Sequence, residues 1–94
     1  MANYELMLIV NPSISEDDRN SSIGEVKTLI EKASGKIVKE DIWGDRKLAY
    51  KINSSARGFY VLFDLELDGK EIKTITKEIN LNKNIWRHMF VSKD

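Results

Sequence analysis

The chain has 94 residues, 41% of them hydrophobic, and its 15 basic and 15 acidic residues cancel to a formal net charge of zero. This length predicts a single domain over residues 1–94, and a neutral chain is poorly suited to coating nucleic acid by charge alone. The lack of cysteine excludes disulfides and thiolate metal sites, and the longest apolar stretch near the start, Leu6 to Val10, is far too short to span a membrane.

The first third of the chain predicts a strand and then a helix. Residues 4–10 are apolar at nearly every position, which is typical of a central strand. Asn11-Pro12-Ser13 ends the strand, and Ser15 is a suitable N-cap for the helix that follows. Gly35 stops this helix, whose apolar residues share one stripe: Ile23, Val26, Leu29, Ile30 and Ala33.

The remaining chain predicts three strands and a second helix. Residues 36–53 form an extended stretch whose alternation changes phase at Gly44, which indicates a bulge or bend in one long strand. Residues 53–56 predict a hairpin loop, and Asp68-Gly69 predicts a turn before a helix over residues 72–79. Residues 85–92 predict the last strand. The strand after the hairpin places its odd-numbered residues toward the core: Phe59, Val61, Phe63, Leu65 and Leu67.

The order β-α-β-β-α-β predicts an α+β fold of the ferredoxin-like class. Two right-handed crossovers place both helices on one face of a four-stranded antiparallel sheet. The other face of the sheet and its edges stay open, so that is where we expect a partner to bind. The fold class alone does not identify the partner.

Positive charge is concentrated in two stretches that contain no acidic residue, residues 46–57 and residues 79–93. A neutral protein can still present local positive potential from such stretches. They are equally consistent with ordinary solvated edges of the sheet.

The residues needed for catalysis are missing. His88 is the only histidine and has no cysteine to pair with, so we expect it to be a strand residue at the sheet surface. The five glycines are scattered singly and form no phosphate-binding loop. We therefore expect no enzyme activity, no cofactor, no metal site and no small-molecule substrate. One alternative hypothesis is a small enzyme or ligand-sensing domain, which requires a polar pocket with perturbed ionisable groups.

A second hypothesis is a stand-alone RNA-binding module. The segment from Arg57 to Phe63, with sequence RGFYVLF, resembles the aromatic signature of RNA-recognition motif domains. That signature requires its stacking aromatics on the open face of the sheet. Here Phe59 and Phe63 belong to the core-facing set, so only Tyr60 is placed to stack on a base.

The whole chain resembles the bacterial small-subunit ribosomal protein six family. Tyr4-Glu5 opens the first strand as in that family, and Asn11-Pro12 closes it. The most specific match is Gly44-x-Arg46-x-Leu48-Ala49-Tyr50-x-Ile52 in the second strand. Two further matches are Gly58-Phe59-Tyr60 in the third strand and Asn84-x-x-Arg87 at the fourth.

This resemblance implies a non-enzymatic structural protein of the small ribosomal subunit, located on the ribosome in the cytoplasm. It implies binding to the central domain of the small-subunit ribosomal RNA, together with ribosomal protein eighteen as a heterodimer. A basic partner would explain how a neutral chain takes part in RNA binding.

The resemblance and the charge pattern together suggest two sets of site residues. We expect RNA contacts from the basic residues of the hairpin and the last strand: Arg46, Lys47, Lys51, Arg57 and Arg87. Partner contacts are expected from three aromatic residues, Trp43, Trp86 and Tyr60, although core packing is an equally good explanation for each tryptophan. Leu48, Ala49, Tyr50 and Ile52 are expected to be mainly structural.

Overall fold

The computed structural model describes residues 2–93; Met1 and Asp94, the two ends of the expected domain, lie outside the described residues. The elements follow the predicted order: β1 Ala2–Val10, α1 Glu16–Lys32, β2 Lys36–Ile52, β3 Ser55–Leu67, the short 3₁₀ helix η1 Gly69–Glu71, α2 Ile72–Asn80 and β4 Ile85–Ser92.

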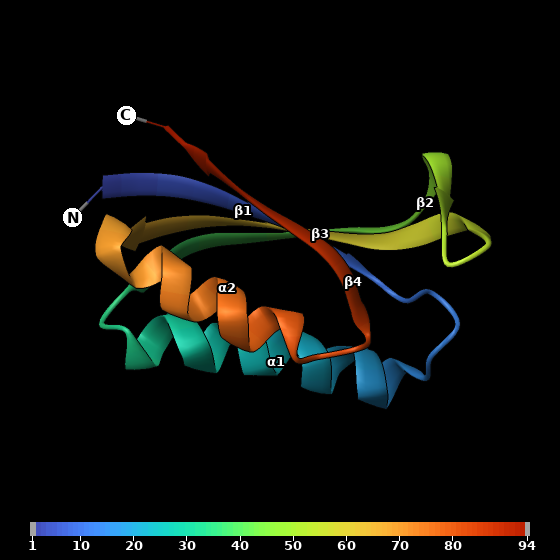
Figure 1. Ribbon diagram of the computed structural model, residues 1–94, viewed down its shortest axis with the longest axis horizontal. Helices are drawn as coiled ribbons and strands as arrows, with labels where there is room; N and C mark the ends of the chain where they lie inside the picture. The colour runs from blue at the N-terminus through green and yellow to red at the C-terminus, as the bar shows by residue number, and fades with distance from the viewer. Residues whose placement is uncertain (1, 94) are drawn as a thin grey trace.

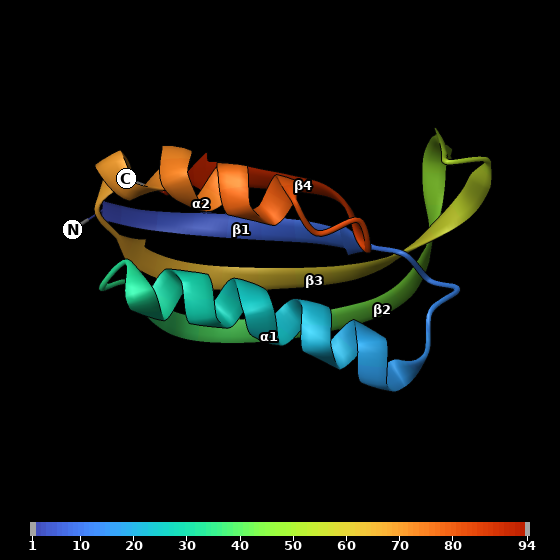
Figure 2. The same ribbon diagram turned by 60° about the horizontal axis from the view of Figure 1, so that its bottom comes forward.

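The four strands form one sheet in the order β2-β3-β1-β4, and every neighbouring pair is antiparallel. Both helices lie on the same side of this sheet (Figure 1), with α1 along β2 and β3 and α2 along β1 and β4 (Figure 2). The predicted ferredoxin-like architecture is therefore confirmed. As expected from its continuous apolar run, β1 is a central strand, between β3 and β4.

The core lies between the sheet and the two helices. From β3, the odd-numbered residues Val61, Phe63, Leu65 and Leu67 are at most 1% exposed, which confirms the predicted alternation. Phe59 packs against this core while remaining partly exposed. The rest of the core comes from one face of β1, α1, α2 and β4: Leu6, Leu8, Val10, Ile23, Val26, Ile30, Ile75, Ile79 and Ile85. Because Phe63 is fully buried here, the RNA-recognition signature is not displayed on the open face.

Helix α1 begins at the predicted cap, where the Ser15 hydroxyl accepts a hydrogen bond from the Asp18 backbone N–H at 3.1 Å. Its end differs in detail from the prediction. Ser34, not Gly35, adopts the left-handed conformation, with a φ of 62°. Gly35 is needed for close packing instead, because a Cβ there would lie 2.8 Å from Leu67 Cδ1 and 2.9 Å from Ile30 Cγ2.

The β2–β3 hairpin is tighter than predicted. Only residues 53 and 54 form the turn, since Ile52 already pairs with Ser55. Asn53 and Ser54 have φ values of 49° and 64°, as the two central residues of a type I′ turn require. The predicted irregularity at Gly44 is confirmed: the register with β3 shifts between Ile42 and Gly44, and Gly44 has a φ of 82°.

Candidate functional site

The face of the sheet turned away from the helices, called here the open face, carries apolar side chains from every strand. Side chains from all four strands line its hollows: Met7 and Ile9 of β1, Trp43 and Tyr50 of β2, Tyr60 and Leu62 of β3, and Met89 and Val91 of β4. Met89 and Val91 are 57% and 46% exposed. We call Met7, Ile9, Trp43, Tyr60, Leu62, Met89 and Val91 the apolar patch. A contiguous exposed apolar surface of this kind is typical of a protein interface.

Trp43 and Tyr60 form an aromatic pair within the apolar patch. Their rings are nearly parallel, at 10°, with centroids 6.3 Å apart. Gly44, next to Trp43, lies opposite Tyr60 in the β2–β3 register, at the point where the register shifts. The bulge at Gly44 therefore brings the indole beside the Tyr60 ring.

The tip of the β2–β3 hairpin bends to the side of the sheet opposite the helices (Figure 1). Leu48 is 7% exposed and lies beside Gly58, close to Ile9 of β1. A Cβ at position 58 would lie 2.5 Å from Ile9 Cγ2 and 3.2 Å from Leu48 Cδ2, so this approach requires glycine. Leu48 is buried as predicted, but in this small cluster at the hairpin and outside the main core.

The bend of the hairpin tip brings a side chain of the edge strand β2 into contact with a side chain of the opposite edge strand, β4. Tyr50 belongs to β2 and Arg87 to β4, which lie at opposite ends of the strand order. The Arg87 guanidinium nevertheless lies over the Tyr50 ring, 5.2 Å from its centroid. Both residues line a hollow of about 410 Å³, whose floor includes Met7, Ile9 and Tyr60. A cation over an aromatic ring beside an open hollow can stack on a base or contact a phosphate.

Four of the five basic residues predicted to contact RNA have no acidic partner among residues 2–93: Arg46, Lys47, Lys51 and Arg87. Each of them is exposed. Arg46 and Lys47 line a second hollow together with Trp43 and Tyr60. The structure therefore brings predicted RNA contacts and predicted partner contacts together at the hairpin end of the open face.

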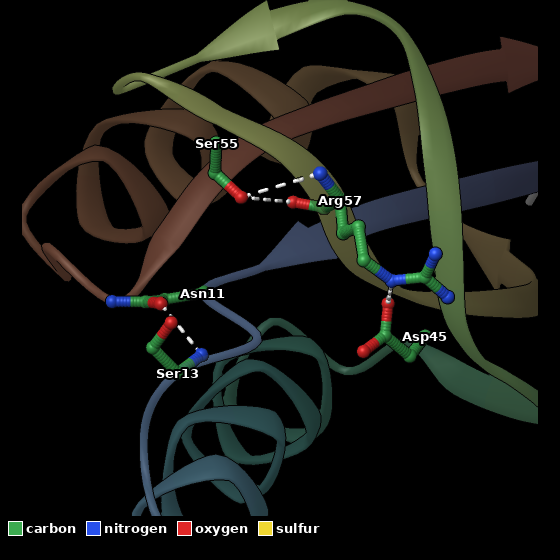
Figure 3. Close-up of polar contacts among 5 residues, drawn as sticks. All are labelled: Asn11, Ser13, Asp45, Ser55 and Arg57. Carbon is green, nitrogen blue, oxygen red and sulfur yellow. Dashed lines mark hydrogen bonds and ion pairs between the residues drawn. The ribbon is translucent and has the colours of Figure 1, made fainter.

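Arg57, the fifth predicted RNA contact, is paired. Its Nε donates a hydrogen bond to Asp45 Oδ1 at 2.7 Å (Figure 3). Its backbone is held by Ser55, whose hydroxyl accepts from the Arg57 N–H and donates to the Arg57 carbonyl (Figure 3). Asp45 thus compensates the charge of Arg57, although the Arg57 side chain is 56% exposed and the Asp45 side chain 50%.

Trp86 is the predicted partner contact that the structure does not bring to the apolar patch. The β1–β4 register shifts between Ile9, which faces Arg87, and Val10, which faces Ile85, so Trp86 occupies a bulge. It is half-buried, outside both the main core and the hollows of the open face.

His88 faces the helices, because its register partner is the core residue Leu8. Its Nε2 lies 3.4 Å from Thr76 Oγ1 of α2, and its ring meets Phe90 edge-on. Burial lowers the pKa of His88 below its ordinary value of 6.5. The sequence interpretation placed it at the sheet surface, whereas it is half-buried under α2.

Residues 2–93 contain no cluster of three or more histidine or acidic side chains that could hold a metal ion. Neither helix of this part of the chain has the length and hydropathy needed to cross a membrane. The hollows of the open face are lined mainly by apolar, aromatic and basic side chains, with Glu5 at the margin, so the arrangement suits binding of an extended surface.

The family model for ribosomal protein S6 matches residues 3–92. The chain belongs to the ribosomal protein S6 family. This finding confirms the expected class, a structural non-enzymatic ribosomal protein of the small subunit on the cytoplasmic ribosome.

Two relatives of the S6 family match over nearly all of their length. The small ribosomal subunit protein bS6 of Clostridioides difficile is 40% identical over 91 residues, which are 97% of this chain and 98% of that protein. The bS6 protein of Fusobacterium nucleatum is 35% identical over 94 residues and covers all of both chains.

One solved structure agrees with this S6 assignment, and a second shares only the fold. The crystal structure of 30S ribosomal protein S6 from Thermotoga maritima matches with a TM-score of 0.92 and 29% identity, covering 98% of this chain and 87% of that one. The C-terminal domain of the MgtC protein from Mycobacterium tuberculosis matches with a TM-score of 0.67 at 8% identity, and this likeness shows the fold alone.

For this S6-family chain, sequence reasoning missed the apolar residues of the open face. A signal was present in β1, where Met7 and Ile9 alternate with the core residues Leu6, Leu8 and Val10. A strand that is apolar on both faces, in a sheet covered by helices on only one, indicates that a partner covers the other. Leu62 in the outward-facing set of β3 gave the same indication.

Proposed function

We propose that this chain is a structural constituent of the bacterial small ribosomal subunit that binds the central domain of the small-subunit ribosomal RNA together with ribosomal protein eighteen. Residues 1–94 act in this proposal as one domain. Its support is family membership and one feature of the structure: an apolar patch that ends at a group of basic residues with no acidic partner among residues 2–93.

The apolar patch is suited to the protein partner. Its aromatic pair, Trp43 with Tyr60, offers the large rigid side chains that contribute most to binding at protein interfaces. Trp86 is placed at the margin in this proposal, since it lies on a bulge of the edge strand β4.

The hairpin end is suited to RNA. Arg46, Lys47 and Lys51 supply phosphate contacts without first breaking an ion pair within the described residues, while Arg57 would keep or exchange its contact with Asp45. Arg87 lies against Tyr50 with its guanidinium beside an open hollow, so it can stack on a base or reach the backbone. The neutral chain needs a basic protein partner to supply further attraction to RNA.

The test is assembly on a labelled central-domain RNA titrated with equal amounts of the chain and ribosomal protein eighteen. We expect Arg87→Ala to leave the midpoint of thermal unfolding nearly unchanged and to weaken assembly by about 1–2 kcal/mol, as for loss of a charged contact. The matched control is Lys73→Ala, an exposed lysine of α2 on the helix side of the protein, which should assemble like the wild-type chain.

Two results would contradict this proposal. One is a failure of the wild-type chain to bind either ribosomal protein eighteen or the RNA. The other is a large loss of thermal stability in Arg87→Ala with unchanged RNA affinity, which would show that Arg87 is structural. Tight binding of short single strands without any protein partner would favour the stand-alone RNA-binding module instead.

A further inference from the structure

Strand β2 forms one edge of the sheet, so the outward N–H and C=O groups of its middle section pair with no other strand within residues 2–93 (Figure 2). Two large apolar side chains stand on this edge, Val38 and Ile42, each 57% exposed. An edge strand with exposed apolar residues is a template for pairing with another strand.

The segment from Val38 to Ile42, with sequence VKEDI, is self-complementary about its central residue. In an antiparallel pair of two copies with a two-fold axis at Glu40, Lys39 faces Asp41 of the second copy and Val38 faces Ile42 of the second copy. Each contact then occurs twice, as a two-fold symmetric interface requires. We propose that the free chain forms a dimer with a second copy of itself by pairing these β2 edges.

The charges of this segment favour the register. Lys39 and Asp41 already form an ion pair within the strand at 3.5 Å, with side chains 63% and 48% exposed. In the dimer, two such pairs lie side by side with opposite charges facing each other, an arrangement that stabilises cross-strand pairing.

Glu40 would face Glu40 of the second copy across the axis. The negative charge of each Glu40 is already neutralised by an ion pair within its own chain. Lys27 of α1 lies 2.6 Å from Glu40 Oε1. The same region holds a hollow of about 450 Å³ between α1 and β2, lined by Ile23, Gly24 and Ile42 among others. Asn20, Lys27 and Glu40 complete the lining of this hollow, and Val38 of the second copy, facing Ile42, would lie beside it and cover part of its apolar side.

Two bulges limit the pairing. The β2–β3 register shifts between Ile37 and Lys39 and again between Ile42 and Gly44, so the regular edge is short. A pairing of this length buries less than the ~1,200 Å² of stable complexes, so the dimer is weak and depends on protein concentration. Because the two-fold interface occupies the β2 edge of both copies, no β2 edge stays free to bind a third chain, and assembly stops at two chains. The inference concerns the free chain and does not rest on the proposed function.

Cysteine cross-linking tests the register directly, since the chain has no cysteine of its own. In Glu40→Cys the two cysteines face each other across the axis, and facing residues of antiparallel strands lie within disulfide reach. In the control Lys36→Cys, four residues from the axis on each chain, they are roughly 25 Å apart. We expect Glu40→Cys to form disulfide-linked dimers about ten times faster than the control. Equal rates, or no dimer from Glu40→Cys at millimolar protein, would overturn the proposal.

A charge exchange provides the second test, measured by sedimentation equilibrium on the otherwise unaltered full chain. Asp41→Lys places lysines opposite each other and should weaken the dimer about tenfold. The double variant Lys39→Asp/Asp41→Lys restores opposite charges in the same register and should recover the wild-type dissociation constant. Thermal unfolding of each variant shows that the monomer is intact. A double variant as weak as the single one, with unchanged thermal stability, would contradict the register.

Discussion

At the scale of single residues, the most informative side chain is His88. As a lone histidine with no cysteine to pair with, it was expected at the sheet surface, and no local pattern shows that a bulge at Trp86 shifts the alternation of β4. The structure places it opposite Leu8 and against Thr76 of α2, where burial lowers its pKa. Its neutral form therefore fits the folded chain better than its charged form.

This burial gives a pH dependence with a definite sign. The unfolded chain binds a proton at His88 near pH 6.5, whereas the folded chain binds it only at a lower pH. Stability is therefore fully present above pH 6.5 and falls as the pH drops toward the lowered pKa. Urea unfolding at several pH values between 8 and 5 would measure this, and His88→Gln, which cannot titrate, should reduce the slope. An unchanged slope in His88→Gln would assign the dependence to other groups.

Leu48 shows how the position of a buried residue changes its expected energetic role. It is buried beside Gly58 and Ile9, away from the main core that holds Leu8. Since the hairpin tip can collapse onto a shortened side chain, we expect Leu48→Ala to cost about 2 kcal/mol, the lower end for leucine truncations.

The matched comparison for Leu48 is Leu8→Ala in the main core, which should cost about 4 kcal/mol in the same urea unfolding measurement. Leu48→Ala should also release Tyr50 from Arg87, because the bend of the hairpin tip holds those two together. Equal losses in the two variants would show that the hairpin tip is as rigid as the core.

At the scale of elements, Gly44 in strand β2 and Gly24 in helix α1 allow a direct comparison of two glycine substitutions. Neither glycine has a neighbouring atom within 4 Å of a hypothetical Cβ, but only Gly44 has a positive φ. Gly44→Ala should therefore destabilise the chain by about 1–2 kcal/mol through backbone strain alone. Gly24→Ala, within helix α1, should stabilise it by up to about 1 kcal/mol because alanine is the better helix former.

Thermal or urea unfolding distinguishes these two glycines by the sign of the change. Gly44→Ala should also disturb the stacked rings of Trp43 and Tyr60, since the bulge brings them together. Tryptophan fluorescence in a Trp86→Phe background reports on Trp43 alone. A Gly44→Ala chain with unchanged stability and unchanged fluorescence would mean that the bulge relaxes at no cost.

At the scale of the whole molecule, local patterns were enough to predict the fold. The alternation in β3 and the apolar stripe of α1 each gave the correct buried face, and the phase change at Gly44 located the bulge. These features depend only on the period of a strand or helix, which the sequence shows directly. The two-residue turn at 53–54 was missed because Asn53-Ser54 is a weak signal for two consecutive positive φ values.

The candidate site was less predictable because it depends on contacts between distant segments. Tyr50 reaches Arg87 only because Leu48 packs beside Gly58 and next to Ile9, and no local pattern indicates that bend. The pairing of Arg57 with Asp45 depends on a register that the bulge shifts. The position of Trp86 depends in a similar way on a shift of register between β1 and β4.

The pairing of the first strand with the last has a consequence for synthesis. Asn3 accepts a hydrogen bond from the backbone of Lys93, and Tyr4 lies opposite Ser92, so the sheet closes through residues at opposite ends of the described chain. A nascent chain whose β4 segment is not yet made, or is still inside the exit tunnel, leaves β1 with one free edge. The four-stranded sheet is therefore completed only after residues 85–92 have been synthesised and have emerged from the ribosome.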